Sequence, residues 1–479
     1  MKKIASYLKE KYGSWGWMGQ RAHDAEGIDR ILPLDFIISC NHGTDTPIYF
    51  SEENVFSVEK ENGVRRDWSN EDLNASLKGK IGRKIFSRWS NIDGQINLLC
   101  YRSVKKLENY EQAFPHKLKI YAAPVRLKKK FDNKLLLCKN LEKLSLPLIP
   151  FIIDRPGRIT FQEVKERLSA PFVVQSPYGS SGSNTYVIRK KNDFNRLKNT
   201  YPEQTMAIRK YIDGFSLNVN GVIVSQKNGP VTYCSFPSLQ ITGTPECSNL
   251  PKAYCGNDYA SAGSLGKDII EQVKKSVETI GSWMGESGFR GIFGMDFIVG
   301  DGQVYPVEIN PRFQNSTSLF TTLESMQRSR KASLFLLHIA EFLQGEDKNL
   351  RNYIKTFDPE ELMQPLKGSQ IILHNKLSKN IVTGEFIPGI YKIKDNKLKF
   401  AKSGASVTQC SGDEVLITCG VPKPFTPVEP NAPLCKIQVL KPVLDPENKR
   451  EFNEIIKKVI SNVYDKLALV PEKNAVCKA

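Results

Sequence analysis

The sequence predicts a mixed α/β (α+β) fold of several domains, and three observations support this class. At 479 residues the chain is too long for one hydrophobic core, and its 40% of hydrophobic and 25% of charged residues are typical of a globular protein. In the middle of the chain, apolar runs of strand length alternate with helical patterns. After about residue 360, short β-like runs are separated by glycines, which predicts a β-rich C-terminal segment.

The predicted N-terminal α/β domain covers residues 1–120. Its clearest element is the apolar run Ile31–Ile38, which predicts a buried strand, and the polar run Asn41–Pro47 predicts the loop after it. The charged N-terminus lacks the apolar centre of a secretion signal, and no apolar stretch approaches the roughly 20 residues of a membrane-spanning helix. We therefore expect a cytoplasmic protein that has no membrane partner.

The predicted central domain covers residues 121–345. Its first part, 121–205, contains a helix that begins at Lys134 and a glycine-rich hairpin. Its second part, 206–345, contains an amphipathic helix followed by a hairpin that carries carboxylates.

The predicted C-terminal β-rich segment covers residues 346–479 and ends in a helix. Asp445 can cap this helix, and Pro446 suits its first turn. Apolar residues at helical spacing predict its buried stripe: Phe452, Ile455, Ile456, Val459, Ile460, Val463, Tyr464 and Leu467.

Charge and cysteine content limit the partners. The net charge of +17, from 68 basic and 51 acidic side chains, favours anionic partners such as nucleotides or acidic proteins. The basic residues do not interleave with aromatic ones and match no DNA-binding motif, so nucleic acid is not an expected partner. The ten cysteines contain no CxxC pair, and the five histidines are far apart, so we expect reduced, mostly buried thiols rather than a zinc site.

The strongest functional signal is a predicted hairpin over residues 292–309. Gly300-Asp301-Gly302 reads as a three-residue loop between two alternating strands. This register places Asp296 opposite Pro306. The residues expected on one face are Asp296, Glu308 and Asn310, and those expected on the core face are Met295, Phe297, Val307 and Ile309.

The chemistry of the first face favours a magnesium site. Two carboxylates and an amide on one face would repel one another unless a cation joins them, and such oxygen ligands suit Mg²⁺ shared with substrate phosphates. Arg312 lies close by in the sequence and could grip a phosphate or a carboxylate with two parallel hydrogen bonds.

A glycine-rich hairpin precedes this site. Pro171–Gln175 and Thr185–Arg189 read as strands, and the loop between them contains Gly179, Ser180, Ser181 and Gly182. Backbone N–H groups of such small residues can approach phosphate oxygens. The loop is not a Walker loop, because it lacks a Gly-Lys-Ser/Thr sequence and no helix begins there.

These elements occur in an order that resembles the ATP-grasp superfamily over about residues 121–330. Phe131-Asp132-Asn133-Lys134 resembles the family's lysine-containing helix, and the run Gly179–Gly182 resembles its phosphate-covering hairpin. The run Arg209–Gly214 resembles the hinge whose backbone holds adenine. Two positions depart from the family pattern: Gln175 stands where a lysine is usual, and Arg209-Lys210 stands where a glutamate pair is common.

The resemblance implies a role for each candidate residue. It implies Mg²⁺, or Mn²⁺ in its place, on Asp296, Glu308 and Asn310. It implies catalytic roles for Lys134 and Arg312. It implies that ATP is bound by Lys134, Gln175, Gly179, Ser180, Ser181, Gly182, Lys210, Tyr211 and Ile212.

The expected reaction is ATP-dependent activation of a carboxylate, and the identity of the acceptor is open. An amino acid or small carboxylate could be joined to an amine, as in ligases of peptide-like natural-product (antibiotic) pathways, which the run Lys367–Asn375 also resembles. An acidic acyl-carrier protein could instead accept the acyl group as a thioester, as in the butirosin pathway, where the acyl group is L-glutamate. The net positive charge of this chain favours binding of such an acidic partner. A non-catalytic nucleotide-binding protein is the third possibility. A homodimer fits any of them. Four further polar candidates more often have structural roles: His42, Asp45, Arg290 and His374.

Overall fold

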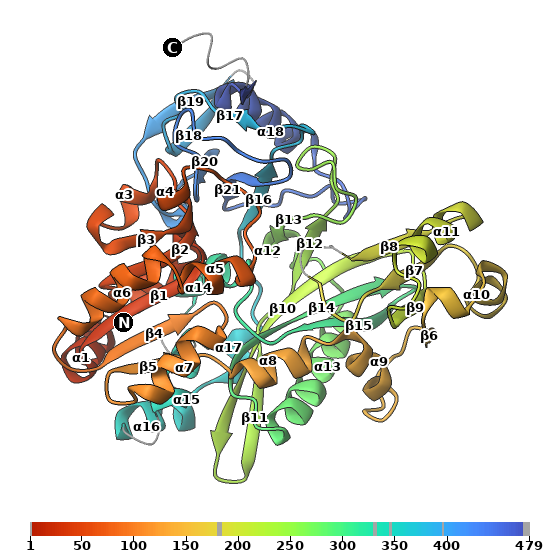
Figure 1. The fold of residues 1–479 in the computed structure, drawn as a ribbon, viewed down its shortest axis with the longest axis horizontal. Coiled ribbons are helices and arrows are strands. Elements are labelled where there is room, and N and C mark those ends of the chain that lie inside the picture. The colour runs from red at the N-terminus through yellow and green to blue at the C-terminus, as the bar shows by residue number, and fades with distance from the viewer. Residues whose placement is uncertain (1, 180–183, 329–332, 344–346, 395–396, 473–479) are drawn as a thin grey trace.

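The computed structural model describes residues 2–179, 184–328, 333–343, 347–394 and 397–472. An N-terminal domain and a small four-stranded lobe adjoin one long sheet, which continues into a C-terminal β region (Figure 1). The predicted mixed α/β class is confirmed.

The N-terminal domain contains a five-stranded parallel sheet in the order β3-β2-β1-β4-β5. Its strands are β1 (Ser14–Arg21), β2 (Phe36–Asn41), β3 (Val55–Ser57), β4 (Ile96–Cys100) and β5 (Leu118–Tyr121). The carboxyl end of β4 leads directly into Tyr101 and Arg102. Because the strands are parallel, their carboxyl ends share one edge, where α/β folds generally bind ligands.

The strand predicted over Ile31–Ile38 was placed too early. A short helix, α2 (Ile28–Ile31), precedes it, and β2 begins only at Phe36. Pro33 cannot donate to a strand ladder, and the Asp35 carboxylate accepts hydrogen bonds from the Lys9 ammonium and the Trp15 amide, which holds this stretch as a turn.

The four-stranded lobe is antiparallel, in the order β6-β9-β7-β8. Its strands are β6 (Phe151–Asp154), β7 (Phe172–Gln175), β8 (Thr185–Ile188) and β9 (Met206–Lys210), with helices α10 (Phe161–Leu168) and α11 (Lys191–Thr200) beside them. The glycine-rich hairpin is therefore β7–β8, as predicted, although residues 180–183 of its loop lie outside the described part of the chain. Helix α9 (Lys134–Leu141) begins at Lys134, capped by the Asn133 side chain.

The long sheet continues from the central region into the C-terminal segment. Its order is β15-β14-β10-β12-β13-β16-β21-β20-β18-β19, with β11 paired to β10. In the central region its strands are β10 (Phe215–Gln226), β11 (Gly229–Cys234), β12 (Ser238–Thr242), β13 (Tyr254–Asp258), β14 (Gly291–Gly300) and β15 (Gln303–Asn310). In the C-terminal region they are β16 (Ser369–His374), β18 (Gly389–Lys394), β19 (Lys397–Lys402), β20 (Glu414–Thr418) and β21 (Pro433–Val439).

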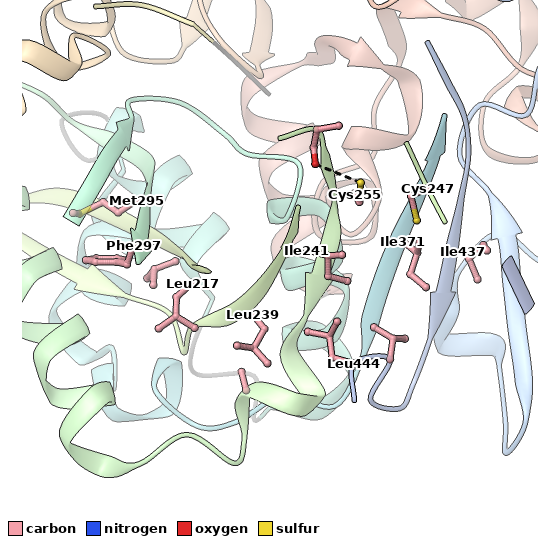
Figure 2. Packing of buried hydrophobic residues seen from close by; sticks show 14 of the residues in the cluster. Leu217, Leu239, Ile241, Cys247, Cys255, Met295, Phe297, Ile371, Ile437 and Leu444 are labelled. Atoms are coloured by element: carbon pink, nitrogen blue, oxygen red, sulfur yellow. Dashed lines mark hydrogen bonds between the residues drawn. The ribbon is translucent and has the colours of Figure 1, made fainter. Parts of the chain in front are cut away.

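One hydrophobic core packs against this sheet from end to end. Leu217, Met295 and Phe297 pack at the hairpin side, while Ile371 and Ile437 belong to the C-terminal strands (Figure 2). All five are essentially inaccessible to solvent. The amphipathic helix α13 (Lys267–Glu286), predicted from its spacing, contributes its apolar face to the same cluster. The core therefore ties the hairpin rigidly to the rest of the molecule.

The turn of the carboxylate hairpin differs from the prediction. Gly300 pairs with Gln303, so the loop has two residues, Asp301 and Gly302, rather than three. Both have positive φ, 52° and 73°, which is the type I′ geometry that Asp-Gly favours.

A β-bulge then shifts the register within the hairpin. Pro306 has no N–H to donate to the ladder, and Val307 is the extra residue next to it. As a result Asp296 lies directly opposite Glu308, not opposite Pro306. Val307 is only half-buried and lines a cavity, so its predicted core position was wrong.

The C-terminal helix was predicted with the wrong start. Helix α18 (Glu454–Leu467) is capped by Asn453, whereas Asp445 accepts hydrogen bonds from Glu447 and Asn448 in a separate turn. Ile455 is 58% exposed and does not belong to the buried stripe.

No helix in the described part of the chain is both long enough and apolar enough to cross a lipid bilayer. Every described cysteine is buried and free.

Candidate active site

A cavity of about 370 Å³ lies where the four-stranded lobe faces the hairpin β14–β15. Apolar side chains line one part of it, among them Ile149, Val173, Ile212 and Ile298. Polar side chains line the rest, among them Gln175, Arg209, Gln240, Asp296, Glu308, Asn310 and Arg312. Tyr101 reaches it from the N-terminal domain. An apolar slot beside convergent polar groups is the usual form of a ligand site.

The two carboxylates face each other across the hairpin. Asp296 on β14 pairs directly with Glu308 on β15, and both line the cavity. Burial and, next, the negative charge of Glu308 raise the pKa of Asp296 to about 6. Such a pair stays unfavourable until a proton or a cation joins it.

Lys134 supplies one positive charge to this pair. Its ammonium donates to Glu308 Oε1 at 3.0 Å and to the carbonyl of Gly179 at 3.1 Å. The side chain is only 4% exposed, so the ion pair is shielded from water. Lys134 thus connects the carboxylate site to the start of the glycine-rich loop.

Asn310 joins the carboxylates to Arg312. Its Nδ2 donates to Asp296 Oδ2 at 3.0 Å, and its Oδ1 accepts from Arg312 Nη2 at 2.9 Å. Arg312 Nη1 also donates to the Tyr101 hydroxyl at 3.0 Å. The four residues Asp296, Glu308, Asn310 and Arg312, predicted from one short stretch, are therefore gathered at one place.

Several amide side chains that position this site escaped the sequence analysis. Asn218 Nδ2 donates to Asp296 Oδ1 at 2.6 Å, and Gln240 Nε2 donates to the same oxygen at 3.2 Å. Gln314 Oε1 accepts from Asn218 at 2.6 Å and from Asn310 at 3.3 Å. One signal was available: Asn218 and Asn220 alternate within an otherwise apolar run, which places both on one face of a strand.

The predicted nucleotide contacts fall into three groups. Gln175, Lys210, Tyr211 and Ile212 all line the cavity. Gly179 lies beside it through its bond to Lys134. The remaining predicted residues, Ser180, Ser181 and Gly182, lie outside the described residues.

Arg209 places a guanidinium in the cavity on the same face of the lobe sheet as Gln175. It pairs with Val173, two residues before Gln175 on β7. Its Nη1 donates to the Val307 carbonyl at 3.2 Å, on the bulge of the hairpin. The side chain is buried, so its charge acts in a medium where screening by water is weak.

The four further polar candidates have structural contacts and do not line the cavity. Asp45 accepts from the amides of Gly420 and Val421, and His42 contacts Glu52 at 3.0 Å. Arg290 bonds Ser225, and burial lowers the pKa of His374 to about 4.

The donor set fits a magnesium ion. Among the described residues no cluster of three or more His, Cys, Asp or Glu side chains is present, so Asp296 and Glu308 stand as a pair. Mg²⁺ is usually held by one or two carboxylates and completes its shell with substrate phosphates and water. The raised pKa of Asp296 indicates that a negative charge at this position is unfavourable, and a bound cation would offset it.

Comparison with known proteins gives one domain match and one distant relative. Residues 131–316 match the ATP-grasp domain family. A formate-dependent phosphoribosylglycinamide formyltransferase from Prochlorococcus marinus is 24% identical over 187 residues, 38% of this chain and 43% of that protein. The chain thus matches less than half the length of this relative.

Two solved structures share the fold at low sequence identity. N5-carboxyaminoimidazole synthase from Aspergillus clavatus, solved with ADP and 5-aminoimidazole ribonucleotide, has a TM-score of 0.54 at 11% identity, over 94% of this chain and 98% of its own. The biotin carboxylase domain dimer of 2-oxoglutarate carboxylase from Hydrogenobacter thermophilus, solved with MgADP, ADP and bicarbonate, has a TM-score of 0.54 at 11% identity, over 90% and 86%. The protein therefore has a mixed α/β ATP-grasp fold, and residues 131–316 match the ATP-grasp domain family.

Proposed function

We propose that the protein is an ADP-forming ligase that activates a carboxylate as an acyl phosphate and transfers the acyl group to an amine. The observation that carries this proposal is the Asp296–Glu308 pair, joined through Asn310 to Arg312 at the polar end of the cavity. The relatives named above are enzymes, and two of them were solved with ADP, which supports an ADP-forming reaction.

In this proposal ATP lies along the cavity. Adenine would occupy the apolar part, beside Ile212 and the hinge backbone at Lys210 and Tyr211. Lys134 and Arg209 would hold the triphosphate. Arg209 would then supply the positive charge that Gln175 lacks, since both face the same space.

Asp296, Glu308 and Asn310 would hold Mg²⁺, with Mn²⁺ as a substitute. When bound, the ion would neutralise phosphate oxygens and so make the phosphorus easier to attack. Lys134 would keep Glu308 in place, and the amides of Asn218 and Gln240 would orient Asp296.

The chemistry assigned to the chain itself is positioning and charge stabilisation. The substrate carboxylate attacks the γ-phosphorus, and ADP leaves with the bridging oxygen. Arg312, held by Tyr101 and Asn310, steadies the charge of the transferred phosphate. The amine then attacks the acyl carbon, loses a proton, and displaces inorganic phosphate.

Oxygen transfer tests this proposal directly. Purified protein is incubated with ATP, Mg²⁺, an amine and ¹⁸O-labelled carboxylates, and the released phosphate is examined by mass spectrometry. An acyl phosphate requires one ¹⁸O to pass from the carboxylate into phosphate. ADP release that never carries ¹⁸O into phosphate would exclude the acyl phosphate.

A Glu308→Gln variant tests the site. Losing one well-placed group of this kind typically lowers the rate by about 10²–10³, and because Glu308 is a proposed Mg²⁺ ligand, raising Mg²⁺ should recover part of the loss. Glu286→Gln, at an exposed residue at the end of α13, is the matched control and should leave the rate unchanged. Full activity in Glu308→Gln would remove the basis of the assignment.

A second candidate acceptor is the thiol of an acidic acyl-carrier protein, as in peptide-like natural-product (antibiotic) biosynthesis. Basic side chains at the cavity support it: Lys210, Lys252, Lys449 and Arg450. Complementary charge would steer such a partner toward this cavity, and its rate of association would fall steeply with salt. Replacing the amine by a phosphopantetheinylated carrier protein in the same assay distinguishes the two acceptors.

A further inference from the structure

Two arginines flank the ring of Tyr101; Tyr101 and Arg312 line the polar end of the cavity, and Arg102 lies behind them against the same ring. The guanidinium carbon of Arg312 lies 5.2 Å from the ring centre, and that of Arg102 lies 5.6 Å from it. Tyr101 and Arg102 come directly after β4, at the ligand-binding edge of the N-terminal sheet. Two domains therefore bring their cations to the same aromatic ring.

Among the described residues, neither guanidinium forms a direct ion pair with a carboxylate. The side chain of Arg312 donates only to neutral groups: the Tyr101 hydroxyl, the Phe313 carbonyl and Asn310 Oδ1. Within the described parts of the chain, no carboxylate oxygen lies within 4.0 Å of either guanidinium. The Nε atoms of both arginines are buried, and no described group accepts a hydrogen bond from them. Buried cations without counter-ions are unfavourable, so this arrangement favours an anion.

A third cation adds to this charge. Lys128 on helix α8 (Val125–Phe131) forms an ion pair with Asp132 at 3.5 Å. Its pKa is lowered, first by burial and also by Arg102 and Arg312. Burial and the charge of Arg312 likewise lower the pKa of Arg102 to about 10. Apart from the Lys128–Asp132 pair, the carboxylates near these cations act on them without a direct contact: Asp132 and Glu71 on Arg102, and Asp132, Glu308 and Asp296 on Arg312.

The nucleotide does not account for Arg102. In the proposed function the triphosphate is held by Lys134 and Arg209, and the transferred phosphate by Arg312. Arg102 comes from the N-terminal domain and approaches the ring of Tyr101, whose hydroxyl accepts from Arg312. Its charge is therefore available to a different anion.

We propose that Arg102, with Arg312, binds a second negatively charged group of the acyl substrate, so that the substrate is a carboxylic acid carrying a further carboxylate or a phosphate. This inference rests on the proposed ligase function. A guanidinium can form two parallel hydrogen bonds with either oxyanion, which gives selectivity as well as affinity. A neutral analogue would leave the guanidiniums unpaired and would be rejected.

Hydroxylamine provides a test that needs no natural acceptor, because it converts an acyl phosphate into a stable hydroxamate. The wild-type enzyme is assayed with ATP, Mg²⁺ and matched acids: L-glutamate against L-glutamine, L-aspartate against L-asparagine, and O-phospho-L-serine against L-serine. For at least one pair, kcat/KM for the acid with the anionic side chain should exceed that for its partner with the neutral side chain about tenfold or more. The carboxylate and phosphate members of the panel distinguish the two kinds of second group.

Variants at Arg102 connect the preference to this residue. Arg102→Gln should raise KM for the preferred acid about tenfold or more and leave KM for ATP within twofold. Arg102→Lys keeps the charge and should retain part of the preference. Arg83→Gln, an exposed arginine of the same domain, is the matched control and should match wild type. Melting temperatures of all variants show that each is folded.

The outcomes separate this inference from the proposed function. If acids with a neutral side chain and acids with an anionic side chain form hydroxamate at equal kcat/KM, the inference is overturned, but the proposed ligase function is retained. An increase in KM for ATP alone in Arg102→Gln assigns this residue to the nucleotide and also overturns it. No hydroxamate from any acid, with no carboxylate-dependent ADP release, removes the ligase proposal itself.

Discussion

The role proposed for Arg209 follows from where its charged side chain lies. It is buried, lines the cavity beside Gln175, and is fixed by its bond to the Val307 carbonyl. A buried cation has a strong field because the surrounding dielectric screens it weakly. The same charge could be supplied to the same space from position 175, where this chain has a neutral amide.

Moving the positive charge from position 209 to position 175 therefore tests this role. Arg209→Gln should raise KM for ATP about tenfold or more, because a charged partner of the triphosphate is lost. Adding Gln175→Lys to this variant should restore much of the affinity for ATP. Steady-state kinetics with varied ATP gives both values, and Gln175→Lys alone is the control. Unchanged KM for ATP in Arg209→Gln would show that Arg209 serves only its contacts with the Val307 and Lys134 carbonyls.

Glu324 is a buried acid outside the cavity. Its Oε1 accepts from the Leu334 amide at 3.2 Å and lies 3.4 Å from Arg328 Nη1. Burial raises the pKa of Glu324 to about 7, although Arg328 acts in the opposite direction. In the unfolded chain this carboxyl would titrate at its ordinary pKa of 4.5. Between these two values the folded protein holds a proton that the unfolded chain has lost.

Stability should therefore fall as pH rises from about 4.5 to 7 and stay constant above that range, as far as this group is concerned. Glu324→Gln removes the charge and should flatten this part of the profile, with a gain of up to about 3 kcal/mol at pH 8. Melting temperatures at pH 5 and pH 8 measure the effect, with exposed Glu286→Gln as the control. Equal pH dependence in wild type and Glu324→Gln would contradict the assignment.

At the scale of the element, the hairpin β14–β15 depends on the close approach of the Gln314 side chain to Gly294. Gly294 lies beneath the Gln314 side chain, and a Cβ at this position would meet Gln314 Cδ at 1.7 Å. Gln314 in turn holds Asn218 and Asn310, and its Nε2 donates to the Val219 carbonyl at 2.8 Å. A methyl group at residue 294 would therefore displace the amide that orients the site.

Gly294→Ala should cost about 1–3 kcal/mol from overpacking and lower the rate by about 10², because small misplacements of reacting groups have effects of this size. Gly266→Ala, where a Cβ meets no atom within 4 Å, is the matched control. Rates are compared at a temperature where the melting curve shows each variant folded. A fully active Gly294→Ala would show that Gln314 does not position the carboxylates.

The same hairpin shows what a sequence can and cannot predict. Period-two alternation was sufficient to place Glu308 and Asn310 on one face of their strand, because that pattern is local, whereas the position of Asp296 on the same face depends on the register between the strands. The bulge at Val307 was not predicted, since it depends on Pro306 and on a turn of two residues rather than three. With this two-residue turn and no bulge, Asp296 would lie opposite Val307, and Glu308 would point to the other face of the hairpin.

At the scale of the whole molecule, contacts between domains complete the site. Tyr101 meets Arg312 although 211 positions separate them in the sequence. No periodicity or spacing predicts such a contact, because it depends on how the N-terminal domain packs against the hairpin. The individual elements were predictable, whereas their junction, and with it the cation pair Arg102 and Arg312, became visible only in the fold.

Arg65 links the N-terminal domain to the C-terminal β region. This fully buried side chain donates to both carboxylate oxygens of Glu59, at 2.9 and 2.8 Å, to the His42 carbonyl at 2.7 Å, and to the Gly420 carbonyl. Burial raises the pKa of Glu59 and Arg65 lowers it, so the carboxylate depends on this partner. Asp45 strengthens the same junction through the amides at Gly420 and Val421.

Arg65→Met should destabilise the protein by about 3–5 kcal/mol, because it leaves the Glu59 charge buried and unpaired. The double variant Glu59→Met/Arg65→Met should recover part of that loss, since it removes both charges but leaves the His42 and Gly420 carbonyls without a donor. Unfolding free energies of the two variants, with exposed Arg83→Gln as control, decide this. A double variant no more stable than Arg65→Met would show that the hydrogen bonds between domains, rather than the ion pair, dominate.

Because Arg65 does not line the cavity, kcat measured at a temperature where the variants are folded should stay near that of the wild type.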